Sequence, residues 1–190
     1  LEHGSYYELL RDHIAYYSFY TLRQLLERNG FAVLEEEMVN RDTISAIVRK
    51  KPEGGWAMPE EPGEKVSLDS LAWGYEVTGG EIRELVRRLA EDGKTLAVWG
   101  ASHQGFTLAA TTELGKAARY IIDSAPFKQG RFAPASHLPI VAPDCFFRDP
   151  VDVVLIVAPG YTEEIAGIIR GKTGGQVKIL AIRTSHIESV

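Results

Sequence analysis

The sequence predicts an α/β fold of the Rossmann-like class over residues 95–184, in which helices flank a mostly parallel sheet. Short, continuous apolar runs alternate there with segments of helical periodicity, which is the pattern of a sheet covered on both faces. The first run leads directly into a glycine-containing turn at residues 100–105, the glycine turn, which opens a helix. The expected strands are 95–99, 120–122, 140–141, 151–157 and 177–182, and the expected helices are 106–114 and 163–169.

Two further helices are expected ahead of this alternation. Residues 68–73 and 81–90 have helical apolar spacing, and Gly79-Gly80 interrupts the pattern between them. Asp92-Gly93 is a stop signal for the second helix. With the alternation that follows, these helices complete a Rossmann-like domain over 68–190.

The sequence of residues 18–48 predicts a helix followed by a β-hairpin. Ser18 can cap a helix with apolar spacing that stops at Asn29-Gly30. Residues 31–34 and 43–48 are rich in β-forming side chains, and the polar residues 40–42 suit a turn between them.

A linker is expected between these two parts. Residues 51–65 hold three prolines and three glycines among charged side chains, with too little apolar material to pack. We therefore divide the chain into residues 1–50, a linker at 51–67 and a domain at 68–190. Because the chain starts with Leu1-Glu2-His3 and not with Met, we expect a fragment of a longer protein.

Composition and charge disfavour two classes of partner. The net charge of -5 and the pI near 5.6 leave no basic surface for nucleic acid. No apolar run reaches the roughly 18 to 20 residues that a membrane span needs, and there is no signal-peptide core. These features predict a soluble, cytoplasmic protein.

The few potential metal ligands do not predict a metal site. Cys145 is the one cysteine, and its neighbours Phe146 and Phe147 predict a buried thiol. His103 and His137 have no second ligand at helical or hairpin spacing.

The glycine turn is the first candidate for ligand binding. A strand–turn–helix junction presents free amides and the positive end of a helix, which suits a phosphate. Ser102 stands where the dinucleotide fingerprint has glycine, and Gln104 where a nucleophile elbow has glycine. Asp123 follows the next strand at about the offset of a ribose-binding acid. A purely structural glycine turn is an equal alternative.

Two other segments could contribute to a site. Residues 123–143 form a long loop in which Lys128, Gln129 and Arg131 offer donors for a diphosphate, although a solvated surface loop would look the same. Asp12-His13 adjoins Tyr16, Tyr17, Phe19 and Tyr20, and a carboxylate beside a histidine can tune a general base. On residues alone, an ordinary hydrophobic domain junction is favoured there.

Three stretches together resemble the C-terminal part of the S-adenosylmethionine-dependent sugar C-methyltransferases, which methylate deoxysugar nucleotides. They are DHIAYYS at residues 12–18, VWGASHQGFTL at 98–108 and IDSAPFKQGRFAPASHLPIVAP at 122–143. The resemblance implies an upstream zinc module and methyl-donor domain, with residues 1–50 as the tail of the latter. It also implies that the C-terminal domain helps to hold the nucleotide-diphosphate sugar.

The resemblance implies roles for particular residues. His13 would be the base that removes a proton next to a sugar keto group, and Asp12 would orient it, although Leu10 and Arg11 replace the tyrosine and histidine of the family motif. Gln104 stands where some relatives carry lysine. The substrate contacts implied for the other domain are Gly100, Ser102, Gln104, Gly105, Thr107, Asp123 and Lys128.

Three functions remain open at this point. The chain is the substrate-holding part of a C-methyltransferase, a stand-alone nucleotide-binding module, or a structural domain with an empty cleft. S-adenosylmethionine is expected in the parent enzyme but not on this chain alone, because the chain has no glycine-rich acidic donor motif. A donor motif and a cysteine cluster upstream in the reading frame would indicate the first function.

Overall fold

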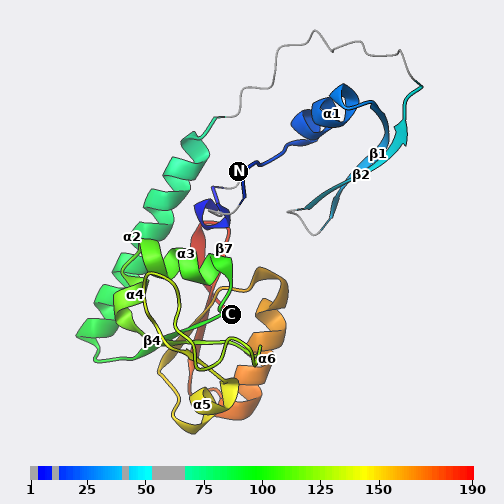
Figure 1. Cartoon of the computed structure of the whole chain (residues 1–190). Coiled ribbons are helices and arrows are strands. Elements are labelled where there is room, and N and C mark those ends of the chain that lie inside the picture. Colours follow the sequence, from blue (N-terminus) through cyan, green and yellow to red (C-terminus); the bar gives the residue numbers. More distant parts are fainter. Residues whose placement is uncertain (1–3, 10–12, 40–42, 53–66) are drawn as a thin grey trace. The chain divides into compact units, whose positions relative to one another are not determined.

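The structure, a computed structural model, describes residues 4–9, 13–39, 43–52 and 67–190 (Figure 1). The chain forms two compact units. One combines Leu1–Leu10 with Leu68–Val190 and is called the sheet unit; the other, Arg11–Ser67, is called the helix–hairpin unit. Each is described by itself.

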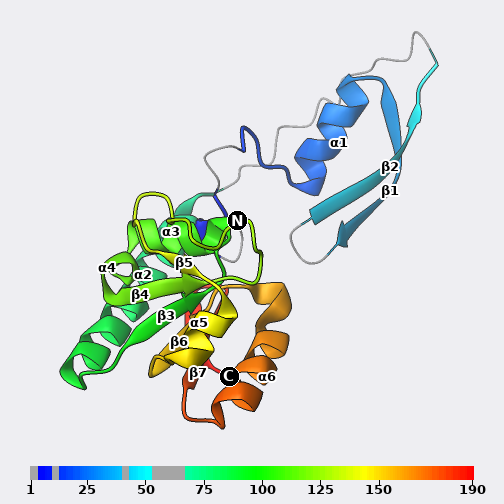
Figure 2. The same cartoon turned by 60° about the horizontal axis from the view of Figure 1, so that its bottom comes forward.

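A six-stranded sheet organises the sheet unit (Figure 2). Its order is β5-β4-β3-β6-β7-β8, which is the order of a Rossmann fold. All neighbouring strands are parallel except β7 and β8. The prediction of a mostly parallel, Rossmann-like sheet is therefore confirmed. The strands are β3 (Leu96–Trp99), β4 (Ala118–Ile122), β5 (Ile140–Val141), β6 (Val153–Ile156), β7 (Lys178–Arg183) and β8 (His186–Ser189).

Helices cover both faces of this sheet, as the apolar strands predict. Alternate side chains of β3 enter two separate cores: Val98 joins one, and Ala97 and Trp99 join the other. The first core also contains side chains from η1 (Tyr6–Glu8), α2 (Asp69–Glu91), α3 (His103–Thr111) and α4 (Leu114–Ala117). The second contains side chains from α5 (Pro143–Arg148) and α6 (Thr162–Thr173), and a short turn, η2 (Pro159–Tyr161), precedes α6.

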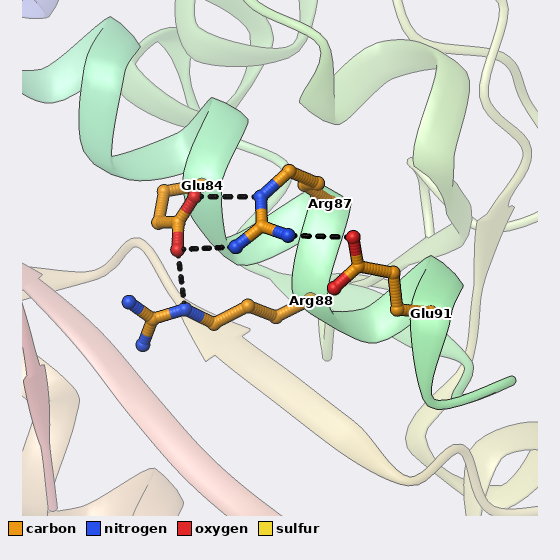
Figure 3. Close-up of polar contacts among 4 residues, drawn as sticks. All are labelled: Glu84, Arg87, Arg88 and Glu91. Atoms are coloured by element: carbon orange, nitrogen blue, oxygen red, sulfur yellow. Dashed lines mark hydrogen bonds and ion pairs between the residues drawn. The ribbon is translucent and has the colours of Figure 1, made fainter.

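The expected break at Gly79-Gly80 is wrong, because α2 is one continuous helix. Leu71, Ile82 and Leu89 lie on its buried face on both sides of the glycines. Packing of this long face outweighs the roughly 1 kcal/mol that each helix-interior glycine costs relative to alanine. The exposed face of α2 carries an ion-pair network of Glu84, Arg87, Arg88 and Glu91 (Figure 3).

The expected helix at 106–114 is also corrected. It begins three residues earlier, because the Ser102 hydroxyl caps it by accepting a hydrogen bond from the Gly105 amide at 3.4 Å. It ends at Thr111, and the separate helix α4 follows. A Cβ on Gly115 would lie 2.1 Å from the Ala109 carbonyl oxygen, so only glycine permits this tight approach.

The prediction that Cys145 is buried is wrong. Cys145 lies on the exposed side of α5, and Arg148 Nη2 donates to its Sγ at 3.5 Å. Phe146 is the fully buried residue of this short helix and meets the edge of the Trp99 ring. Helix α5 and the antiparallel strand β8 were not predicted, since neither is long enough to show a periodic pattern.

The helix–hairpin unit contains α1 (Phe19–Arg28), β1 (Phe31–Val39) and β2 (Thr43–Lys50). Ser18 caps α1 as predicted, and the antiparallel hairpin is present. Strand β1 extends beyond the expected 31–34, because pairing with β2 continues past a bulge between Val33 and Glu35. The predicted turn at 40–42 lies outside the described residues. Within 13–39 and 43–52, only Gly30 is buried, so the described residues of this unit form no core of their own.

Candidate functional site

The order of the strands identifies one edge of the sheet as the candidate site. The chain runs outward from β3 to β4 and β5, and then returns to continue with β6 on the other side of β3. In such sheets ligands bind at the carboxyl ends of the strands where the order reverses. That point lies between the glycine turn, which follows β3, and residues 157–161, which follow β6. The second segment carries no recognisable motif, and sequence analysis did not find it.

Close packing explains both glycines of the turn. Gly100 has a φ of +127°, and a Cβ there would lie 2.5 Å from the Val157 carbonyl oxygen. A Cβ on Gly105 would lie 2.2 Å from the Gly100 carbonyl oxygen. These contacts bring the strand end, the turn and the helix together without a ligand. Packing alone therefore explains why glycine is needed at both positions, as the structural alternative predicts. Ligand binding at the turn stays a prediction.

Asp123 and Lys128 come together beside the glycine turn. Asp123 Oδ2 accepts hydrogen bonds from the Ala101 amide at 2.9 Å and from Lys128 Nζ at 3.1 Å. Asp123 Oδ1 accepts from the Ala125 amide at 2.8 Å. Lys128 Nζ also donates to the Ala101 carbonyl at 2.8 Å. The pair therefore fastens the long loop to the turn, which the spacing in the sequence did not indicate.

The rest of the long loop has an unusual backbone conformation and exposed aromatic side chains. Ala135 and His137 have φ values of 61° and 56°, a region that non-glycine residues seldom adopt. Phe132 forms an isolated bridge with Pro139, and both Phe127 and Phe132 are exposed. The loop thus presents aromatic surface next to Lys128, whose ammonium lies 5.7 Å from the centre of the Phe127 ring.

A second acidic residue reaches the glycine turn from the beginning of the chain. Residues 4–9, which we call the strap, pack with the sheet unit. Glu8 Oε2 lies 3.0 Å from His103 Nε2, and Glu8 Oε1 accepts a hydrogen bond from Gln104 Nε2. These partners are more than 90 residues apart in the sequence, so no local pattern could have found Glu8.

Thr107, His13 and Asp12 are the remaining predicted site residues. Thr107 is half-buried on α3, within the sheet unit. His13 belongs to the helix–hairpin unit, where its exposed ring lies 5.7 Å from the Tyr16 ring, and Asp12 lies outside the described residues. No group of three potential metal ligands occurs in the described part of the chain.

Comparison with known proteins identifies the family. The family model described as the C-methyltransferase C-terminal domain matches residues 72–180, which is more than half of the chain. The chain belongs to this family. The match includes the glycine turn, Asp123 and Lys128, and it leaves out the strap and His13.

A curated relative supports the same assignment over a longer span. C-methyltransferase NovU of Streptomyces niveus is 28% identical over 179 residues, which is 87% of this chain and 43% of NovU. The chain thus spans less than half the length of that protein. Among solved structures, UDP-D-quinovosamine 4-dehydrogenase from Vibrio fischeri aligns with a TM-score of 0.40 and 20% identity, covering 51% of this chain and 93% of the dehydrogenase.

Asp123 is the residue of the sheet unit that bears on an adenosine cofactor such as S-adenosylmethionine. A Rossmann-like site holds the ribose of its cofactor with a carboxylate at the end of the second strand, the position of Asp123. Both oxygens of Asp123 are already bonded to the chain itself. We therefore assign no step to the methyl donor on this unit. None of the described helices is long and apolar enough to cross a bilayer.

Proposed function

We propose that this chain is the nucleotide-sugar-positioning part of an S-adenosylmethionine-dependent sugar C-methyltransferase of the cytoplasm, and that methyl transfer requires a preceding methyl-donor domain. The observation that carries the proposal is the family match over residues 72–180, which coincides with the sheet unit from α2 to β7. The C-methyltransferase relative matches most of the rest of the chain.

The helix–hairpin unit supports the need for a preceding domain. A two-stranded hairpin is marginal on its own, and this one has one helix and no buried side chain among its described residues. Leu34, Met38 and Ile47 are each about half exposed. We propose that these apolar side chains complete the core of the methyl-donor domain, and that Asp12 and His13, at the start of the same unit, serve that domain as the proton-abstracting pair.

Lys128 is the residue of the sheet unit best suited to a diphosphate. Its ammonium has three donors, and the described partners, Asp123 and the Ala101 carbonyl, use two. Its side chain remains 29% exposed. In this proposal Asp123 positions Lys128, while Gly100, Ser102, Gln104, Gly105 and Thr107 line the same edge of the sheet.

A stand-alone nucleotide-binding module is the second candidate. The observation that favours it is that the sheet unit has two complete cores and needs no further domain to cover its sheet. The two candidates differ in whether the chain acts with a methyl-donor domain.

Calorimetric titration tests the proposal directly. The chain should bind thymidine diphosphate and not S-adenosylmethionine, with adenosine nucleotides as controls. The protein extended upstream should bind both ligands and methylate a nucleotide-linked keto sugar. Thymidine binding by the chain without any activity of the extended protein would favour the stand-alone module. Binding of S-adenosylmethionine by the chain alone would contradict the proposal.

Substitution of Lys128 locates the diphosphate. Lys128→Ala should weaken thymidine diphosphate binding by about 1.5 to 3 kcal/mol, because a charge-assisted hydrogen bond is lost. Lys172→Ala is the matched control, since Lys172 is an exposed lysine of the last turn of α6. Equal affinities of the two variants would remove Lys128 from the site.

A further inference from the structure

The first turn of α3 already faces a negative charge of the chain itself. Glu8 pairs there with His103 at 3.0 Å and accepts a hydrogen bond from Gln104. These are the first two residues of the helix, where the aligned backbone dipoles favour an anion. A phosphate approaching this turn would meet the carboxylate of Glu8, so the charge that usually attracts phosphate is compensated within the fold.

The strap holds Glu8 firmly in this position. The Tyr6 hydroxyl lies 2.9 Å from Thr111 Oγ1, and the Tyr7 hydroxyl donates to the Thr184 carbonyl. Burial raises the pKa of Tyr7 to about 12, so this donor keeps its proton at neutral pH. Gly4 packs so closely on α2 that a Cβ on Gly74 would lie 1.7 Å from the Gly4 carbonyl oxygen. The position of Glu8 is therefore built into the sheet unit.

Three of the six amides at the glycine turn are also engaged. The Gly100 amide donates to the Ile122 carbonyl at 2.9 Å, and the Gly105 amide donates to Ser102 Oγ. The Ala101 amide donates to Asp123, the second carboxylate beside the turn. Two carboxylates thus flank a turn in which three amides already have partners, which is unfavourable for phosphate and favourable for groups that donate hydrogen bonds.

We propose that Glu8 is a specificity-determining residue of the nucleotide-sugar site. Its carboxylate keeps phosphate away from the first turn of α3 and accepts hydrogen bonds from a neutral, hydroxylated part of the ligand. The Glu8 side chain is 39% exposed, so hydroxyl groups of a ligand can reach its carboxylate. The inference rests on the proposed function and refines it, because the diphosphate is left to Lys128 and the hydroxyl groups to Glu8.

Calorimetry on the whole chain with three probes tests this role. The probes are inorganic pyrophosphate, thymidine diphosphate and thymidine-diphosphate glucose. Glu8→Gln should tighten pyrophosphate binding about fivefold, because a nearby like charge is removed. High salt should abolish this gain. The preference for the sugar nucleotide over thymidine diphosphate should fall about tenfold, since an amide is a weaker acceptor for hydroxyls than a carboxylate.

Two further variants control for charge and for folding. Glu164→Gln removes an exposed carboxylate from the first turn of α6 and should change neither measurement. Glu8→Ala should tighten pyrophosphate binding as Glu8→Gln does. Unfolding midpoints of all variants should match the wild-type midpoint within a few degrees.

The outcomes separate this inference from the proposed function. If pyrophosphate binding stays the same, weakens or is undetectable in both Glu8 variants, the role of Glu8 is overturned. An unchanged preference for the sugar nucleotide overturns it as well. If the wild-type chain binds neither thymidine ligand, the proposed function fails for this chain, and the pyrophosphate comparison alone then decides whether Glu8 repels phosphate.

Discussion

The sheet unit and the helix–hairpin unit differ in how they bury their apolar side chains. In the sheet unit, helices on both faces cover the strands, and side chains such as Ile82 and Phe146 are fully buried. In the helix–hairpin unit, one helix accompanies two strands, and Leu34 and Ile47 remain more than half exposed. The sheet unit encloses its apolar side chains in two cores, whereas large apolar side chains among the described residues of the helix–hairpin unit stay exposed.

The largest effect is expected from a pair of isoleucines, one in each unit. Ile82→Ala should lower the free energy of unfolding by about 3 to 4 kcal/mol, because it leaves a cavity in the first core. Ile47→Ala should cost less than about 0.5 kcal/mol, because Ile47 is 57% exposed. Urea denaturation followed by tryptophan fluorescence measures both. Equal costs would show that the hairpin has a core in solution, and the contrast between the units would fail.

A pair of glycines at the candidate site should give the next largest effect. Gly100→Ala should cost about 2 to 4 kcal/mol, because alanine at a φ of +127° would also press on the Val157 carbonyl oxygen. Gly160→Ala, on the neighbouring segment, should be nearly neutral because a Cβ there meets nothing within 4 Å. Thermal unfolding of the two variants compares them. A neutral Gly100→Ala would show that the edge of the sheet rearranges freely.

Two serine caps, one in each unit, should give smaller effects on stability. Ser102 caps α3 by accepting a hydrogen bond from the Gly105 amide, and Ser18 caps α1 through a reciprocal capping box with Thr21. Ser102→Ala should lower the stability of the whole sheet unit by about 1 kcal/mol. Ser18→Ala should speed amide exchange in α1 without moving the main unfolding transition, because α1 is not part of that core. A shift of the main transition by Ser18→Ala would mean that the two units unfold together.

The smallest effect is expected from the exposed network on α2. Hydrogen bonds from Arg87 and Arg88 lower the pKa of Glu84 from 4.5 to about 2 (Figure 3). Because the folded-state pKa is lower, the contribution of Glu84 is present above pH 4.5 and is lost as the pH falls toward 2. Glu84→Gln should therefore lower the unfolding temperature slightly at pH 7 and not at pH 2, since the pair is exposed. A difference that persists at pH 2 would contradict this account.

The sequence alone determined the class of fold and the position of the glycine turn. Continuous apolar strands such as β3 and β6 need helices on both faces, so the alternation of runs was sufficient. The caps at Ser18 and Ser102 act through neighbouring amides, although only the first was recognised beforehand. Short elements such as α5 and β8 carry too few residues to show periodicity, and the uninterrupted α2 depends on a buried face that local propensity does not register.

The tertiary structure decided which residues meet at the site. The Asp123 carboxylate meets the Ala101 amide and Lys128, contacts that the spacing in the sequence did not indicate, and its role toward a ligand stays a prediction. Glu8 was not predicted at all, since its partners His103 and Gln104 are reached only when the strap packs against α2 and α3. Local patterns record the preferences of neighbouring residues along the chain, whereas the charge around the glycine turn depends on segments that the fold brings together from far apart.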